Sequence, residues 1–333
     1  MTFTILGAGL QTTVQDLGRP AFQRDAIPAG GAMDRLACRA ANLLIGNDEN
    51  AAVLETTLLG PAIRFDEETL IGLAGGDLNA TIDGRPLSSW RAALVPVGGM
   101  LRFGQPANGC RNYIAVAGGI DVPMVFDSRA TYLRGGFGGL EGRALRAGDT
   151  LRTLRPTAAT RAMASTVAAT ETRIARWSLG ATLRPHYADR VEVRIVEGAH
   201  TSLLSPTSRT TLTGNAFRVS SSSDRMGYRL EGTSMELNHP TELMSEGVAF
   251  GTVQLPPGGA PIVLMADRQT TGGYPRIAEV ASVDLPLIAQ LKPGDTVTFR
   301  LISLAEAQRL YLAQEGELAQ ARAGLMLRFS HQK

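Results

Sequence analysis

Short runs rich in apolar residues, some of them alternating with polar ones, recur along this chain, and they predict β-strands rather than long helices. Clear examples are residues 3–6, 60–65, 112–117, 193–196 and 260–265. Glycine and proline residues separate these runs, as they do at turns between strands. The pattern therefore predicts a mainly β fold.

Three segments carry the longer spacing of a helix. Asp34 stands at an expected N-cap, ahead of apolar residues at helical spacing that end at a glycine. Ser303 and Glu306 form a capping-box pattern that opens a helix reaching about residue 323. Residues 170–177 are a third, shorter candidate. We therefore expect a few helices added to a β-rich framework.

A faint internal repeat relates the two halves of the chain at an offset of 190–191 residues. Residues 3–6 align with 193–196, and Asp34 aligns with Asp224. Several such matches in constant order suggest duplication of one domain. The offset falls to 146 near the end of each half, so the first copy carries about 45 extra, glycine-rich residues. We expect two tandem, related domains.

The repeat predicts three consecutive parts in this chain of 333 residues, a length that suits two domains. The first domain covers residues 1–155 and includes the glycine-rich insert. Residues 156–190 are rich in Ala, Thr and Arg and are expected to form a linker. The second domain covers residues 191–333 and ends in the C-terminal helix.

Composition and net charge indicate some classes of protein and exclude others. Hydrophobic residues make up 44% of the chain and charged residues 19%, which predicts a packed core. The net charge of +2 is spread along the sequence, so we expect no nucleic-acid partner. Two distant cysteines, and no apolar stretch long enough to span a membrane, indicate a soluble cytoplasmic protein without disulfides.

Several nucleotide and metal motifs are missing. Neither Lys292 nor Lys333 follows the glycine pattern of a phosphate-binding P-loop, and no lysine lies between methionines as in a biotin carrier. The four histidines lack the spacing of metal ligands. We therefore predict no metal site and no ATP site of the P-loop type.

Three polar constellations are candidates for chemistry, and the first is residues 11–20. Gln15, Asp16 and Arg19 lie there beside a glycine and a proline, which favours a structured loop that positions a polar ligand. The alternative is an Asp–Arg pair that only organises the turn.

The second constellation is the loop before Asp34 together with its repeat partner, residues 220–229. Small residues before a helix leave backbone N–H groups that attract anions. Arg225 or Arg229 is suited to clamp a carboxylate with two hydrogen bonds. The alternative is that Asp34 and Asp224 only cap their turns, which accounts less well for the serine run beside Asp224.

The third constellation follows a buried-looking strand, where polar loops often bind ligands. Its polar residues of interest are Gln254, Asp267, Gln269, Thr270 and Tyr274. A solvated hairpin would satisfy the same pattern, so both interpretations remain open at this point.

Five segments are recognisable together: residues 9–20, 31–34, 41–47, 223–230 and 266–275. They resemble the family of the 5-oxoprolinase C subunit, also known as the biotin-dependent carboxyltransferase family or allophanate hydrolase subunit 2. The resemblance covers most of the chain, and motifs of this length are specific to a family. It implies cyclophilin-like β-barrel domains, in agreement with the repeat.

The resemblance also implies one component of an ATP-dependent complex that cleaves 5-oxoproline to glutamate, with partners that resemble the A and B subunits of 5-oxoprolinase. ATP with magnesium would be used by the complex and not bound by this chain alone. Related sequences form the carboxyltransferase half of urea carboxylase, a role that would involve biotin. Others are named as antagonists of a sporulation-kinase inhibitor. A carboxyltransferase for urea or a similar amide, and a non-catalytic regulator that binds a kinase-inhibitor partner, are therefore alternatives.

Under the 5-oxoprolinase hypothesis, the predicted catalytic residues are Asp34, Asp267, Gln269 and Thr270. The predicted substrate-binding residues are Arg19, Gln15, Asp224, Arg225, Arg229, Gln254 and Tyr274. Arg225 and Arg229 are expected to hold the substrate carboxylate. We expect the site in a cleft between the two domains, because ligand sites favour domain interfaces.

Overall fold

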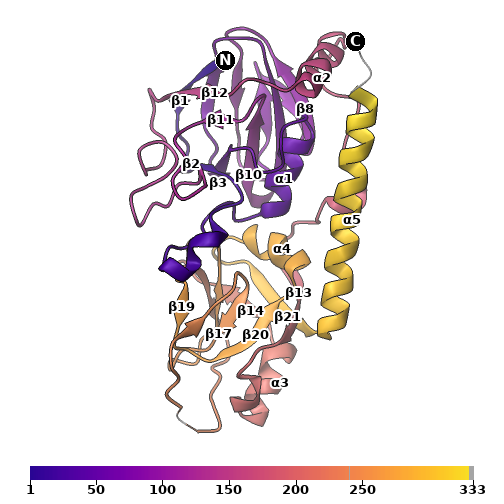
Figure 1. The fold of residues 1–333 in the computed structure, drawn as a ribbon. Helices are drawn as coiled ribbons and strands as arrows, with labels where there is room; N and C mark the ends of the chain where they lie inside the picture. The colour runs from indigo at the N-terminus through magenta and orange to yellow at the C-terminus, as the bar shows by residue number, and fades with distance from the viewer. Residues whose placement is uncertain (240, 330–333) are drawn as a thin grey trace. The chain divides into compact units, whose positions relative to one another are not determined.

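The computed structural model describes residues 1–239 and 241–329, which divide into two compact units (Figure 1). Unit 1 consists of Met1–Gly18, Asp34–Pro185 and the described part of the segment that begins at Gly316. Unit 2 consists of Arg19–Met33 and His186–Glu315. Each unit is therefore assembled from stretches that are distant in the sequence.

Unit 1 contains two antiparallel sheets. The seven-stranded sheet has the order β11 (Ile120–Asp121), β12 (Thr150–Thr153), β1 (Thr2–Gly7), β4 (Ala62–Phe65), β9 (Met100–Arg102), β6 (Ala80–Ile82) and β7 (Arg85–Leu87). The five-stranded sheet has the order β2 (Gln11–Gln15), β3 (Val53–Thr57), β10 (Asn108–Val116), β5 (Thr69–Asp77) and β8 (Arg91–Val95). Phe3 and Ile5 alternate with more exposed residues on β1 and pack in one core with Leu54 and Ile114 of the other sheet.

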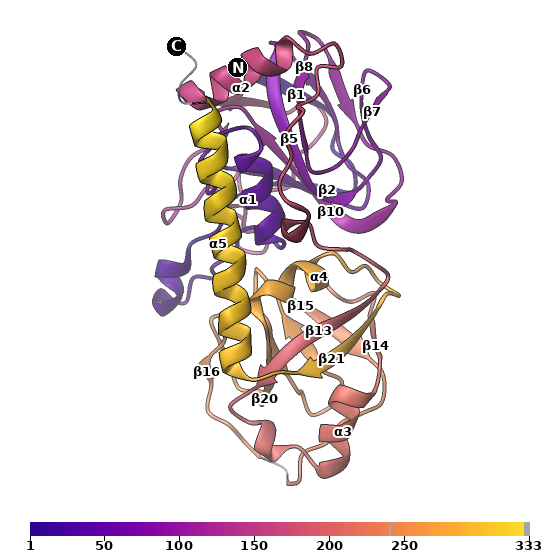
Figure 2. The ribbon, with the colours of Figure 1, turned by 90° about the vertical axis from the view of Figure 1, so that its right-hand side faces the viewer.

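Unit 2 is a closed barrel, several strands of which are labelled in Figure 2. Its order is β13 (Arg190–Glu197), β20 (Arg276–Val280), β17 (Thr252–Gln254), β18 (Ile262–Leu264), β15 (Gly227–Glu231), β14 (Phe217–Val219) and β21 (Thr296–Leu301). A separate ribbon pairs β16 (Glu246–Gly247) with β19 (Thr271–Gly272). The rings of Phe217 and Phe299 lie 5.9 Å apart in the barrel core. Together the two units confirm the predicted mainly β fold.

The helices are few. The α-helices are α1 (Arg35–Leu43), α2 (Ala158–Ala168), α3 (Pro206–Gly214), α4 (Leu285–Ala289) and α5 (Leu304–Phe329). The 3-10 helices are η1 (Pro20–Asp25), η2 (Ala181–Leu183), η3 (Thr201–Leu203) and η4 (Ser282–Asp284). Among the described residues, none of these helices combines the length and the apolar character that crossing a membrane requires.

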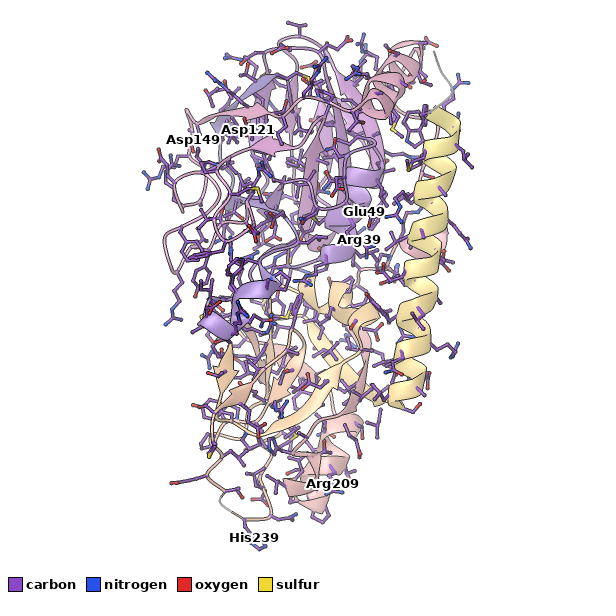
Figure 3. All side chains as sticks on the ribbon, in the orientation of Figure 1. Arg39, Glu49, Asp121, Asp149, Arg209 and His239 are labelled. Atoms are coloured by element: carbon purple, nitrogen blue, oxygen red, sulfur yellow. The ribbon has the colours of Figure 1, made fainter. Side chains whose placement is uncertain are left out.

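Two of the predicted helices are confirmed with their caps. Asp34 Oδ1 accepts a hydrogen bond of 2.9 Å from Ala37 N at the start of α1. Helix α1 is further fixed by an ion pair of 2.6 Å between Arg39 Nε and a carboxylate oxygen of Glu49, both labelled in Figure 3. Ser303 Oγ accepts from the backbone N–H of Glu306 at 3.1 Å at the start of α5, and this helix runs beyond residue 323 to Phe329.

The predicted short helix over residues 170–177 is wrong. The helix of this region is α2, where Thr157 Oγ1 accepts from Thr160 N at 3.0 Å and caps an alanine-rich run of high helix propensity. Ile174 instead forms an antiparallel bridge with Ala93 of β8. Pairing with the edge of a sheet therefore outweighed the weak helical pattern of this segment.

The two compact units have boundaries that differ from those of the three consecutive parts expected above. Residues 156–185 belong to unit 1, whereas Arg19–Met33 belongs to unit 2. The structure does not confirm a tandem duplication, because unit 1 has two sheets and unit 2 has a closed barrel. Strand β1 pairs antiparallel with β12, whereas β13 pairs parallel with β21.

The repeated Gly-Asp motif does reproduce a local turn. Gly148 and Gly294 both have a φ of 95°. The carboxylate that follows each glycine accepts a backbone N–H from three residues earlier, at 2.7 Å for Asp149 and 2.9 Å for Asp295. The matching residues therefore specify the same turn, while the strands that follow pair differently.

Candidate functional site

Three loops of unit 2 meet around Asp267. One follows β18, the second is the turn between β14 and β15, and the third is Arg19–Met33. Asp267 N donates to the carbonyl of Arg225 at 2.8 Å, and Gly30 N donates to the carbonyl of Ala266 at 3.1 Å. These backbone hydrogen bonds hold residues that are far apart in the sequence in one place.

A buried ion pair stands at the centre of the loops. Arg225 Nε donates to Asp267 Oδ2 at 2.9 Å, and Arg225 Nη2 donates to Asp267 Oδ1 at 3.0 Å. The same Nη2 donates to the carbonyl of Gly31 at 2.6 Å. A forked pair of this kind fixes both planar groups. Arg225 therefore positions the carboxylate of Asp267 and anchors the glycine loop.

Two glycines let the third loop approach Asp267 closely. Gly30 and Gly31 have φ values of 59° and 86°, in the left-handed region that glycine tolerates. A Cβ on Gly30 would lie 3.0 Å from Arg19 Nη1 and 3.7 Å from Asp267 Oδ1. The guanidinium of Arg19 and the carboxylate of Asp267 therefore face the same small space.

Arginine side chains gather around these loops. Arg19, Arg225 and Arg268 are buried there, together with the carboxylate of Asp267. Guanidinium groups in a site of reduced solvent access attract carboxylates and phosphates strongly. The arrangement is therefore suited to an anionic ligand.

The sequence analysis did not select Arg268, although it lies in the third polar constellation. Its Nε donates to the carbonyl of Val248 at 3.3 Å, and its guanidinium carbon lies 5.9 Å from the centre of the Phe250 ring. Burial raises the pKa of the nearby Glu279 carboxyl above its ordinary value, and the charge of Arg268 partly offsets this effect. Thr252 Oγ1 also donates to Glu279, at 2.7 Å.

Two glutamine side chains meet at the end of the same loop. Gln269 Nε2 donates to Gln254 Oε1 at 3.4 Å, and Gln254 Nε2 donates to the carbonyl of Tyr274 at 3.4 Å. A Cβ on Gly272 would lie 2.6 Å from Gln254 Nε2, so a larger residue there would push this carboxamide aside. Each carboxamide offers a donor and an acceptor, which suits an amide ligand. The two hydrogen bonds are long, which leaves both groups able to turn toward a ligand.

Thr270 and Tyr274 lie at the more exposed side of this group. Thr270 is partly exposed, and its carbonyl accepts from Val248 N at 3.1 Å. The Tyr274 side chain is 46% exposed. Both predicted residues are therefore at least partly accessible to solvent.

The structure leaves two predicted residues outside the group around Asp267. Asp224 is exposed, and its Oδ1 accepts from Met226 N at 2.8 Å, which organises the turn before β15. Arg229 is exposed on β15, and its side chain makes no hydrogen bond or ion pair within the described chain. Arg225, by contrast, is committed to Asp267.

Gln15 and Asp34 belong to unit 1. Gln15 is buried, and its Nε2 donates to Thr13 Oγ1 at 3.0 Å and to the carbonyl of Thr131 at 3.2 Å. Asp34 is fully buried and caps α1, the alternative role that the sequence analysis gave it. Both side chains thus hold elements of unit 1 together.

A buried polar network in unit 1 was missed by the sequence analysis. The Tyr113 hydroxyl donates to Glu55 Oε2 at 2.8 Å and accepts from Asp34 N at 2.7 Å. Burial raises the pKa of the Tyr113 phenol, and the charge of Glu55 adds to this shift. The register pairs Glu55 with both Tyr113 and Thr13. The sequence signal that could have revealed this network is the recurrence of polar residues at every second position of the strands.

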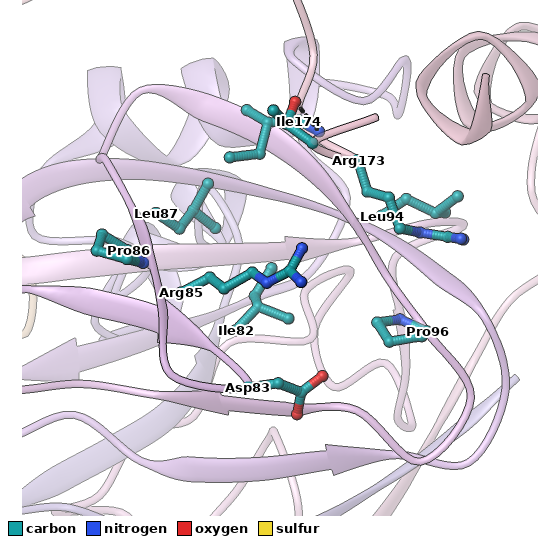
Figure 4. A pocket seen from close by; sticks show the side chains of 10 residues that line it. Ile82, Asp83, Arg85, Pro86, Leu87, Leu94, Pro96, Arg173 and Ile174 are labelled. Atoms are coloured by element: carbon teal, nitrogen blue, oxygen red, sulfur yellow. Dashed lines mark hydrogen bonds between the residues drawn. The ribbon is translucent and has the colours of Figure 1, made fainter. Parts of the chain in front are cut away.

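A pocket of about 340 Å³ also lies in unit 1, at the hairpin of β6 and β7 (Figure 4). None of the predicted site residues lines it. It is therefore a candidate ligand site that shares no lining residue with the loops around Asp267.

Carboxylates, histidines and lysines are the groups that would hold a metal ion or a phosphate. Within the part of the chain that the structure describes, no group of three or more His, Cys, Asp or Glu residues is arranged to hold a metal ion. Lys292 Nζ is engaged by carboxylate oxygens of Asp189 at 2.8 Å and Asp295 at 3.0 Å. Lys292 is therefore not arranged to hold a phosphate, and Lys333 lies outside the described residues.

The fold and these loops define a mainly β protein with a closed barrel and an arginine-rich buried polar site. The chain belongs to the family described as carboxyltransferase domain, subdomain A and B, whose profile matches residues 26–301.

Two relatives match almost from end to end. The chain is 36% identical over 318 residues to the 5-oxoprolinase C subunit of Haemophilus influenzae, a match that covers 96% of this chain and 97% of that protein. It is 38% identical over 304 residues to the 5-oxoprolinase C subunit of Escherichia coli, covering 91% and 92%.

A solved structure with a similar fold is Kluyveromyces lactis urea carboxylase. The TM-score is 0.86 and the sequence identity 28%. The match covers 96% of this chain but only 29% of that much longer one. This chain therefore corresponds to one part of a larger protein there.

Proposed function

We propose that this chain is the C subunit of a 5-oxoprolinase, a complex that hydrolyses 5-oxoproline to glutamate with ATP. The observation that carries the proposal is the near end-to-end similarity to two proteins named as the C subunit of 5-oxoprolinase. The buried site supports it, because 5-oxoproline presents a carboxylate and a cyclic amide, and unit 2 contains buried arginines and a pair of carboxamides in contact with each other.

The reaction breaks the C–N bond of the lactam and adds water at its carbonyl carbon. In our proposal Arg19 contributes the positive charge that attracts the substrate carboxylate. Gln254 and Gln269 turn their carboxamides to the lactam N–H and carbonyl and hold that carbonyl while charge develops on its oxygen.

Asp267 is proposed to face the reacting end, where a carboxylate can accept a proton from water. Arg225 is a positioning residue, because its guanidinium already holds Asp267 and the carbonyl of Gly31. Thr270 and Tyr274 border the entry of the ligand. Asp224 and Arg229 are left out of the proposed contacts, because Asp224 organises its own turn and Arg229 is exposed.

The remaining parts of the proposal concern the complex. Proteins that resemble the A and B subunits of 5-oxoprolinase are the proposed partners, in the cytoplasm. ATP with magnesium is assigned to them, since Lys292 is engaged by carboxylates and Lys333 follows no P-loop pattern. We also propose that the two units are diverged cyclophilin-like domains, with the shared Gly-Asp turn as the remaining trace of duplication.

A carboxyltransferase for urea or a similar amide is the second candidate. It is favoured by the family description and by the similarity to K. lactis urea carboxylase. The same carboxamides would then bind the accepting amide, and carboxyl-biotin would arrive from another protein or domain.

The test compares glutamate release from 5-oxoproline with ATP for this chain alone and for the chain mixed with its candidate A and B partners. We expect activity only in the full mixture. Gln254→Leu should remove most of that activity, whereas the exposed Arg102→Gln should not change it. Lack of turnover in every mixture, together with carboxylation of urea from carboxyl-biotin, would establish the second candidate instead.

A further inference from the structure

The pocket of unit 1 lies where its two sheets end. Strand β7 is the last strand of the seven-stranded sheet, and β8 is the last strand of the five-stranded sheet. The two strands are close in the sequence but do not pair with each other. The lining residues are Ile82, Asp83, Arg85, Pro86, Leu87, Leu94, Pro96, Thr172, Arg173 and Ile174.

The edge of β8 is already covered by a later part of the chain. Leu94 N donates to the carbonyl of Arg173 at 2.9 Å, and Ala175 N donates to the carbonyl of Ala92 at 2.9 Å. Arg173 has a φ of 56°, a left-handed conformation that costs free energy in a residue other than glycine. The hydrogen bonds to β8 hold this conformation and keep the neighbouring Ile174 at the pocket wall.

The edge of β7 is a poor acceptor for an added strand. It is three residues long, and its middle residue, Pro86, has no N–H to donate. Proline at a sheet edge is a recognised obstacle to strand addition. A small molecule therefore suits the space better than an extended peptide, and about 340 Å³ is within the size range of small-molecule sites.

The polar groups at the pocket include an arginine that can bind an anion. Figure 4 shows the guanidinium of Arg85 among the lining side chains, and it makes no hydrogen bond or ion pair within the described chain. Arg173 is paired with Glu68, so its charge is balanced. Asp83 Oδ1 accepts from Met100 N at 2.9 Å, which ties the β6–β7 turn to β9.

The rest of the wall is apolar. Leu87 and Leu94 are almost fully buried at its base, and Ile82 and Ile174 pack against the core of unit 1. A ligand that fits both the arginine and the apolar wall of the pocket has one carboxylate and a compact hydrocarbon body.

We propose that this pocket binds a small monocarboxylic acid, with its carboxylate on Arg85 and its apolar body against Leu87, Leu94 and Ile174. The site shares no lining residue with the loops around Asp267, and the proposal does not depend on the 5-oxoprolinase assignment. An arginine fork recognises a carboxylate by two parallel hydrogen bonds, which a neutral alcohol of the same shape cannot replace.

The test is a titration of the full chain, labelled at the isoleucine methyl groups, with cyclohexanecarboxylate and with cyclohexanemethanol. We expect the carboxylate to shift the NMR signals of Ile82 and Ile174, and the alcohol to bind at least about tenfold more weakly. Arg85→Gln should weaken carboxylate binding by a similar factor, and Arg102→Gln, an exposed arginine outside the pocket, should leave the Kd unchanged. Thr172→Phe should block the space.

Each contrary result is informative. Equal affinity for the acid and the alcohol, or an unchanged Kd in Arg85→Gln, would show an apolar crevice without carboxylate recognition and would overturn the proposal. Absence of any shift at the two isoleucines in the correctly folded wild-type chain would overturn it as well.

Discussion

The buried pair of Arg225 and Asp267 permits a quantitative prediction. Asp267→Asn keeps the shape of the side chain but removes its charge, so the guanidinium of Arg225 stays buried without its carboxylate. The side chains are only 8% and 6% exposed, so solvent screens the pair very little. Asparagine can accept one of the two hydrogen bonds that the carboxylate accepts in the wild type.

Removing one partner of a buried ion pair costs about 3–5 kcal/mol, because the remaining charge lacks compensation. We expect the lower part of this range, about 3 kcal/mol, since one hydrogen bond is retained. If the free energy of unfolding falls by about 2 kcal/mol for each molar of urea, the urea concentration at the unfolding midpoint should fall by about 1.5 M. Replacing both residues, as Arg225→Met with Asp267→Leu, should recover much of this loss, because apolar side chains need no compensation.

The assay is urea unfolding followed by circular dichroism, with hydrogen exchange of the β15 and β18 peptides as a local measure. Glu231→Gln is the matched control, since its pair with Arg218 is exposed on the same strand β15 and should leave the midpoint unchanged. A midpoint for Asp267→Asn equal to that of the control would refute the reasoning. A double variant that is less stable than the single one would also refute it.

Two further predictions concern a helix cap and pH dependence. Asp34→Ala should lower the free energy of unfolding by about 1 kcal/mol, the cost of a lost N-cap, whereas Asp34→Asn should lower it much less. An unchanged thermal unfolding temperature of the alanine variant would contradict the capping role. Because the Glu279 pKa is raised by burial, this carboxyl favours the folded state below its unfolded pKa and loses that contribution as pH rises. Glu279→Gln should therefore gain stability relative to wild type as pH rises above about 4.3, and parallel stability profiles of the two proteins would disprove it.

Local features of the fold followed from neighbouring residues alone. The caps at Asp34 and Ser303 lie within three residues of the N–H groups they accept from, so a short pattern was enough to predict them. The strands were predictable for the same reason, because the alternation of apolar and polar side chains is visible within a few residues. The helix expected over residues 170–177 failed because its outcome depended on a distant strand, β8.

The candidate site was predictable as residues but not as an arrangement. The sequence marked Arg19, Arg225, Asp267, Gln254 and Gln269 as polar groups in unusual loops. It did not indicate that Arg225 would be committed to Asp267, 42 positions away, and to Gly31, 194 positions away. Contacts at such separations are set by strand order, which local patterns do not encode.

What the sequence by itself determined here is the mainly β character, the helix caps, the Gly-Asp turns and the polar loops, all of which depend on residues near one another. Only the tertiary structure decided that Arg19–Met33 joins unit 2 and that seven strands close into a barrel there. It also decided that Asp34 caps a helix while Asp267 meets the arginines. The physical reason is that burial and ion pairing act between whatever groups the topology brings together, however far apart they lie along the chain.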